Sequence, residues 1–132
     1  FADATQSVPR LTQRLIDILD LARNDGVMEK LPLAIYTSGD VAPAAIRAAA
    51  QRDTLVRAVA CHGGLIDRAG VQALELLVAP LLMLFDANDL AGQTACQRAT
   101  RHLICTHTTQ VLDIGDDPAA PAANWFLSIF SG

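Results

Sequence analysis

The pattern of hydrophobic and polar positions along the chain predicts helices that alternate with short strands. Apolar residues recur every three or four positions over residues 11–22, which is typical of a helix that buries one face. Pro9 fits the first turn of such a helix, and Gly26 is expected to end it. Four short apolar runs, each closed by a polar or glycine-bearing turn, predict strands at residues 31–37, 56–61, 80–85 and 109–114.

Between and after these runs, alanine-rich or amphipathic segments predict helices at residues 42–51, 72–77, 91–103 and 119–130. Strands that alternate with helices indicate right-handed crossovers, and therefore a mostly parallel sheet with helices on both faces. The chain is thus predicted to be a single α/β domain over residues 1–132 with four strands. The run at residues 31–37 is apolar throughout, so we expect a strand that is buried on both faces.

Polar residues and glycines gather where the predicted strands end. In parallel sheets, ligands bind at the carboxyl ends of the strands, so these turns are candidate pocket positions. An equally simple explanation is that turns need such residues for solvation and backbone geometry alone. The candidates are Ser38, Gly39, Asp40, Cys61, His62, Gly63, Asp86, Asp89 and the turn at residues 115–117.

Composition removes several function classes. The formal net charge is −4, which leaves no basic surface for nucleic acid. No apolar segment approaches the length of a membrane helix, and no signal peptide is visible. Cys61, Cys96 and Cys105 are an odd, irregularly spaced set, which indicates a reducing, cytoplasmic compartment. With no CxxC or CxxH pair, and with histidines spaced unlike ligands, neither a metal nor another cofactor is expected.

Three segments carry a resemblance to a known family: LPLAIYTSGDVAPAAIRAAA, VRAVACHGG and APLLMLFDAND. They resemble α/β-hydrolases of the dienelactone-hydrolase-like group, in which a strand enters a G-x-S-x-G turn and then an alanine-rich helix. A strand leading to a GG turn follows, and then a strand whose loop holds the acidic member of the catalytic triad. The resemblance covers the C-terminal part of that fold, and it implies further strands upstream that this chain does not contain.

The nucleophile turn of the family falls at residues 37–41 and is degenerate. Gly39 stands where the serine is expected, while Thr37 and Val41 replace the two glycines. A glycine has no oxygen with which to attack, and a valine crowds a turn that needs small neighbours. Moving the register by one residue makes Ser38 the nucleophile, but its flanks, Tyr36 and Asp40, fit the motif worse.

The other triad positions are only partly filled. Asp89 or Asp86 stands where the acid belongs, although Asp89 also fits the N-cap of the next helix. No histidine follows the last strand, and His107 lies before it, at its wrong end. Cys61 and His62 are neighbours on a strand and point to opposite sides, so a buried cysteine and a turn histidine are the simpler interpretation.

The sequence therefore favours a catalytically vacant α/β-hydrolase-like domain, a pseudoenzyme that acts as an assembly or interaction module. Two alternatives remain: a hydrolase of a small ester or lactone with an atypical site, and a small-molecule binding domain. The chain opens at Phe1, so a segment upstream is expected. In the resembled fold the four strands lie side by side in chain order, so the strand at residues 31–37 forms one edge of the sheet in this chain, where that fold has an upstream strand. We expect this edge to pair with a second copy or a separate polypeptide.

Overall fold

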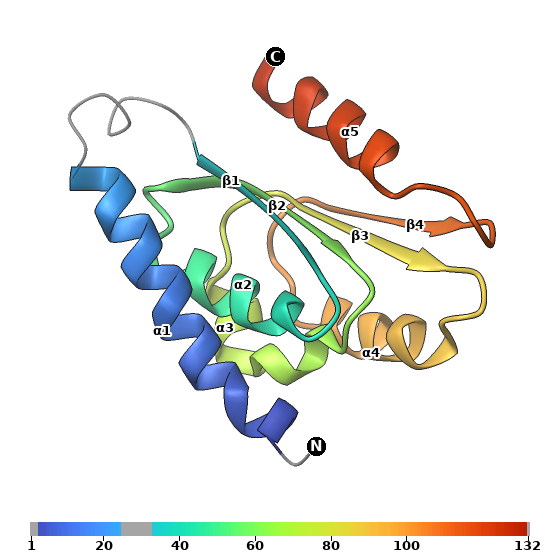
Figure 1. The fold of residues 1–132 in the computed structure, drawn as a ribbon, viewed down its shortest axis with the longest axis horizontal. Helices are drawn as coiled ribbons and strands as arrows, with labels where there is room; N and C mark the ends of the chain where they lie inside the picture. Colours follow the sequence, from blue (N-terminus) through green and yellow to red (C-terminus); the bar gives the residue numbers. More distant parts are fainter. Residues whose placement is uncertain (1–2, 25–32, 132) are drawn as a thin grey trace.

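A computed structural model describes residues 3–24 and 33–131 of the chain (Figure 1). Five α-helices, a short 3₁₀ helix and four strands follow one another in the order α1(Asp3–Asn24), β1(Leu33–Ser38), α2(Val41–Gln51), β2(Val56–His62), η2(Ile66–Ala69), α3(Val71–Leu76), β3(Leu81–Asp86), α4(Leu90–Thr100), β4(His107–Leu112) and α5(Ala119–Ser131). None of the described helices is both long and apolar enough to cross a membrane.

The four strands form one parallel sheet, as the alternation of elements predicts. Their order in the sheet is β1-β2-β3-β4. The crossover helices place all four carboxyl ends along one edge of the sheet. The register aligns Ser38 with His62, and Asp86 with Leu112, so the ends of neighbouring strands lie at similar heights.

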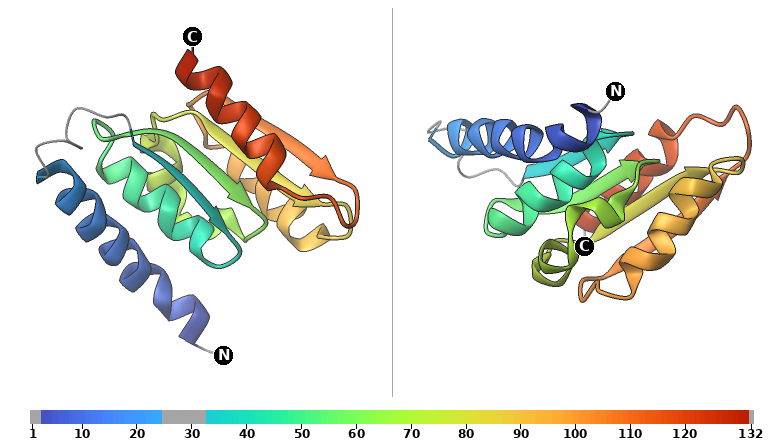
Figure 2. Two further views of the ribbon diagram at one scale, coloured as in Figure 1. Left: turned by 45° about the horizontal axis from the view of Figure 1, so that its top comes forward. Right: turned by 90° about the horizontal axis from the view of Figure 1, so that it is seen from below.

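The two faces of the sheet are covered unequally (Figure 2). Helices α2, α3 and α4 pack on one face, where the large apolar cluster includes Val59, Met83 and Phe85. Helix α5 covers the other face, where a smaller cluster joins Leu82 and Leu84 to α5. The prediction of helices on both faces is confirmed, with most of the core on the side of α2–α4.

Helix α1 is longer at its start than the sequence predicts. It begins at Asp3, so Pro9 lies inside the helix rather than in its first turn. Proline removes one backbone hydrogen bond, but Val8 is buried beside it, and Thr12 donates its hydroxyl proton to the Val8 carbonyl oxygen at 2.7 Å. The expected helix stop at Gly26 lies outside the described residues.

Strand β1 is not buried on both faces, which corrects the prediction. Its side chains alternate between half-buried and exposed, and Tyr36 is 44% exposed. Leu33 and Ile35 pack against the large cluster, whereas the opposite side of β1 lies beyond the part of the sheet that α5 covers. Residues 31 and 32 of the predicted strand lie outside the described residues.

Strand β4 begins two residues earlier than its apolar run predicts. His107, Thr108 and Thr109 pair with β3 although their side chains are exposed, and Leu112 is buried. Backbone pairing at a sheet edge does not require apolar side chains, so the hydrophobic pattern missed the start of this strand. The remaining predicted elements are present, with ends that differ by up to three residues.

Candidate functional site

The turn between β1 and α2 has the strand–turn–helix form of a nucleophile elbow. Gly39 is at its apex with a φ of +61°, a left-handed conformation that glycine adopts readily. Its N–H donates to the His62 carbonyl oxygen at 3.0 Å, and its own carbonyl oxygen accepts from the Ala42 N–H at 3.1 Å. Gly39 therefore has a backbone conformation suited to the apex of an elbow, and it has no side chain that could act as a nucleophile.

Two glycines in contact at this turn differ in how much space surrounds them. A Cβ added at Gly39 would meet no described atom within 4 Å. A Cβ added at Gly64, whose φ is +88°, would overlap the Gly39 carbonyl oxygen and crowd the Ala42 side chain. The turn after β2 therefore packs against the elbow through Gly64, while the space beside Gly39 is open.

Three polar side chains share one face at the ends of three neighbouring strands. Ser38 ends β1 and is the register partner of His62, which ends β2, so both side chains lie on the α5 side of the sheet. His62 Nε2 lies 3.0 Å from Asp86 Oδ1 at the end of β3, and the histidine and aspartate side chains are 23% and 43% exposed. This pairing is the clearest polar contact between the described strand ends.

His62 and Asp86 are both candidates from the sequence, but the sequence pattern does not pair them. Asp86 lies two residues beyond Leu84, the register partner of His62, so the contact depends on the strand register. Side chains two residues apart on a strand lie on the same face of the sheet. Once the order and register of β2 and β3 are known, this periodicity predicts that His62 and Asp86 lie on the same face. A pair this exposed contributes little to stability.

Cys61 points to the opposite side of β2 from His62, as the alternation of a strand requires. It is buried in the large cluster, and Thr37 Oγ1 donates to its sulfur at 3.7 Å. Burial raises the pKa of Cys61 to about 11, with a smaller opposing effect from Thr37. A thiol with that pKa is protonated at neutral pH and is not poised as a nucleophile. The simpler interpretation of Cys61 as a core residue is confirmed.

Asp89, one of the two candidates for the acidic triad position, is engaged as a helix cap. Its Oδ1 accepts the Gly92 N–H at 3.0 Å at the start of α4. Asp89 also lies beside the turn after β2, because a Cβ at Gly63 would be 3.5 Å from its Oδ2. Asp40, at the start of α2, is exposed and makes no capping bond through its side chain.

The turn after β4 contains aspartates in place of a histidine. Asp117 accepts the Ala119 N–H at 2.9 Å at the start of α5. The pKa of Tyr36 is raised, first by burial and then by the negative charge of Asp117. His107 is the first residue of β4, so it lies at the amino-terminal ends of the strands, away from the turns described above. Its Nδ1 lies 3.1 Å from the Cys105 carbonyl oxygen. Within residues 3–24 and 33–131, no three His, Cys, Asp or Glu side chains group to hold a metal ion.

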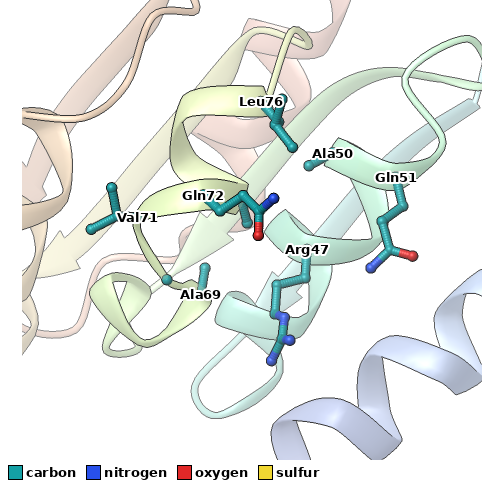
Figure 3. Close-up of a pocket in the computed structure, with 9 residues that line it drawn as sticks. Arg47, Ala50, Gln51, Ala69, Val71, Gln72 and Leu76 are labelled. Carbon is teal, nitrogen blue, oxygen red and sulfur yellow. The ribbon is translucent and has the colours of Figure 1, made fainter.

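A shallow pocket of about 490 Å³ lies in the helical layer (Figure 3). Helix α2 contributes Arg47 and Gln51 to it, and the segment through η2 and α3 contributes Gln72 and Leu76. None of the candidate residues from the strand ends lines this pocket, so it is separate from the elbow.

The parallel order of the strands, the elbow at Gly39 and the acidic loop after β3 together define the fold of an α/β-hydrolase, of which this chain has the C-terminal part. The structure is similar to the crystal structure of dienelactone hydrolase from Anabaena variabilis ATCC 29413, with a TM-score of 0.80 and 25% sequence identity over 92% of this chain. The chain spans 58% of the length of that protein. No protein-family model matches the chain, and no curated protein matches it.

Proposed function

We propose that this chain is an α/β-hydrolase-like domain without a working elbow, and that it acts as an assembly module. The observation that supports the vacancy is Gly39, which holds the backbone conformation of the elbow with no attacking atom. The turn after β4 supplies no histidine as base, and Asp89 is committed to capping α4. Nucleophilic catalysis needs an activated nucleophile with a base in contact, and neither is in its usual place.

The sheet edge supports the assembly role. Strand β1 is paired with β2 on one side, and no described residue pairs with its other side. In the resembled fold, further strands lie beyond this edge, and the matched hydrolase extends well past the part that this chain covers. An unpaired edge presents free backbone donors and acceptors, which attract another strand.

The compartment proposed with this role is the cytoplasm. Cys61, Cys96 and Cys105 are all free in the structure. Free thiols persist in a reducing environment, and disulfides are favoured outside it.

Ester turnover tests the vacancy. The 132-residue chain should hydrolyse p-nitrophenyl acetate and butyrate no faster than a protein-free blank. The variant His62→Gln serves as a matched control, because it removes the imidazole at the end of β2 and keeps a polar side chain. Saturable turnover by the wild-type chain that the control lacks would overturn the proposed vacancy.

The alignment of Ser38, His62 and Asp86 favours an atypical hydrolase of small esters or lactones as a second candidate. In that mechanism, Ser38 Oγ attacks the ester carbonyl carbon while the ring of His62 takes the hydroxyl proton. Asp86, hydrogen-bonded to Nε2, stabilises the imidazolium, and His62 then returns the proton to the departing alcohol. Water would release the acyl group from Ser38 by the same route.

Ester turnover by the variant Ser38→Ala distinguishes the vacant module from the atypical hydrolase. If ester turnover is detected and Ser38→Ala abolishes it, the atypical hydrolase replaces the vacant module. If turnover is detected and Ser38→Ala retains it, Ser38 is not the nucleophile, and both accounts of the strand ends are wrong. Absence of turnover in wild type and variant alike supports the vacant elbow.

A further inference from the structure

The pocket in the helical layer combines one cation with two side-chain amides and an apolar end (Figure 3). Its volume of about 490 Å³ is in the range usual for small-molecule sites. Three alanines line it from α2, η2 and α3, namely Ala50, Ala69 and Ala73. Methyl groups are too short to fill the gap between these helical segments, so the sequence leaves space here.

Arg47 carries the one formal charge among the described residues that line the pocket. Its side chain is half-buried on α2. Arg52 pairs with Asp20, and Arg98 pairs with Asp67, but no ion pair found in the described part of the chain includes Arg47. A half-buried guanidinium that no protein carboxylate neutralises favours an anion from solution as its partner.

Two glutamine side chains accompany Arg47 in the pocket. Gln51 is four residues after Arg47 on α2, so the two side chains lie on one face of the helix, one turn apart. Gln72 belongs to α3, and in Figure 3 its amide lies between α3 and α2. A side-chain amide adds two N–H donors to the five of a guanidinium, and such a group of donors can hold both oxygens of a carboxylate.

The other end of the pocket is apolar. Ala50 and Leu76 lie at the end farther from the Arg47 guanidinium (Figure 3). Leu76 is 55% exposed, and Val71, which also lines the pocket, is 50% exposed. A short hydrocarbon chain bound against these side chains would remove apolar surface from water on both partners. The pocket therefore has a place for a charged head group and a place for an apolar tail.

The charge of the ligand follows from the charges of the protein. One guanidinium neutralises one negative charge, and the chain as a whole carries a net charge of −4, so a ligand with several negative charges is repelled. We infer that this pocket binds a small monocarboxylate with a short apolar chain. Arg47 and the two glutamine amides hold the carboxylate, and Leu76 contacts the chain. This binding site goes beyond the proposed assembly role and does not depend on ester turnover.

Titration of the isotope-labelled 132-residue chain with sodium hexanoate, followed by amide NMR spectra at constant ionic strength, tests the inference. The signals of the Arg47 Nε–H and of the Gln51 and Gln72 side-chain amides should shift and saturate, with a Kd on the order of 1 mM. Sodium acetate lacks the chain and should bind about tenfold more weakly. Hexanol lacks the charge and should cause no saturable shift of the Arg47 signal.

Three variants separate the pocket from a general effect of charge. Arg47→Gln should weaken hexanoate binding by about tenfold or more, because it removes charge-assisted hydrogen bonds. Arg101→Gln removes the same charge from an exposed arginine just after α4, and it should bind hexanoate as wild type does. Leu76→Asn changes an exposed side chain, and it should weaken hexanoate binding while acetate binding is unchanged.

Each of four results would overturn the inference. The first is the absence of a saturable shift up to about 20 mM hexanoate, far above the expected Kd. The second is equal binding by wild type and Arg47→Gln. The third is equal binding of hexanoate by wild type and Leu76→Asn, which decides the matter even if Arg47→Gln does not fold. The fourth is tighter binding of inorganic phosphate than of hexanoate at Arg47, which would make the ligand a phosphate instead of a carboxylate.

Discussion

Two glycines in contact, Gly39 and Gly64, differ in whether the surrounding atoms leave room for a side chain. Both have positive φ values, of +61° and +88°. At Gly64 the surrounding atoms exclude any side chain, whereas at Gly39 a side chain has room and none is present. The backbone packing at this turn therefore depends on Gly64, while the position of Gly39 has room for a side chain. Substitutions on the two sides should differ accordingly.

The largest effect is expected at Gly64. Gly64→Ala adds a Cβ that overlaps the Gly39 carbonyl oxygen, and it also strains a backbone with positive φ. The substitution should lower the free energy of unfolding by about 3 kcal/mol or more, measured by urea denaturation. Gly70→Ala is a matched control, since Gly70 has a φ of +93° and open space around its Cβ position. Equal losses in the two variants would mean that backbone strain alone matters and that the contact with the elbow does not.

A smaller effect is expected at Gly39. Gly39→Ala places a methyl group in open space, so only the left-handed backbone opposes it. The free energy of unfolding should fall by about 1–2 kcal/mol in the same denaturation experiment. Gly39→Ser should lose a similar amount and gain no ester turnover, because no histidine follows β4. Turnover restored by this single change would show that a base already serves the elbow.

The smallest of the three stability effects is expected in the loop after β3. Asp89→Ala removes the oxygen that accepts the Gly92 N–H, and it should cost about 1 kcal/mol of unfolding free energy. Asp89→Asn keeps a capping oxygen and should remain within a few tenths of a kcal/mol of wild type. A loss in Asp89→Asn as large as that in Asp89→Ala would indicate that the negative charge, not the cap, is what this position supplies.

The pattern of apolar residues predicted the order of elements and the parallel sheet, because each strand and helix carries its own period. It also placed Gly39 correctly at the turn from strand to helix. These are local properties, set by side chains within a few residues of one another, and they can be read without knowing the register between strands.

The sequence pattern could not settle two features that depend on neighbours distant in the chain. The contact of His62 with Asp86 requires the β2–β3 register, which places Asp86 two residues beyond the partner of His62. The exposure of Tyr36 depends on where α5 lies, and α5 packs over strands other than β1. An apolar run therefore indicated a strand correctly and its burial wrongly.

Covalent labelling by a serine-reactive fluorophosphonate tests the central claim, that this fold has no working nucleophile, most directly. Intact-mass spectrometry of the wild-type chain should show no stoichiometric adduct after incubation at neutral pH, because Gly39 cannot react and Ser38 lies outside the elbow apex. A stoichiometric adduct that peptide mapping assigns to Ser38, and that His62→Gln abolishes, would contradict the claim.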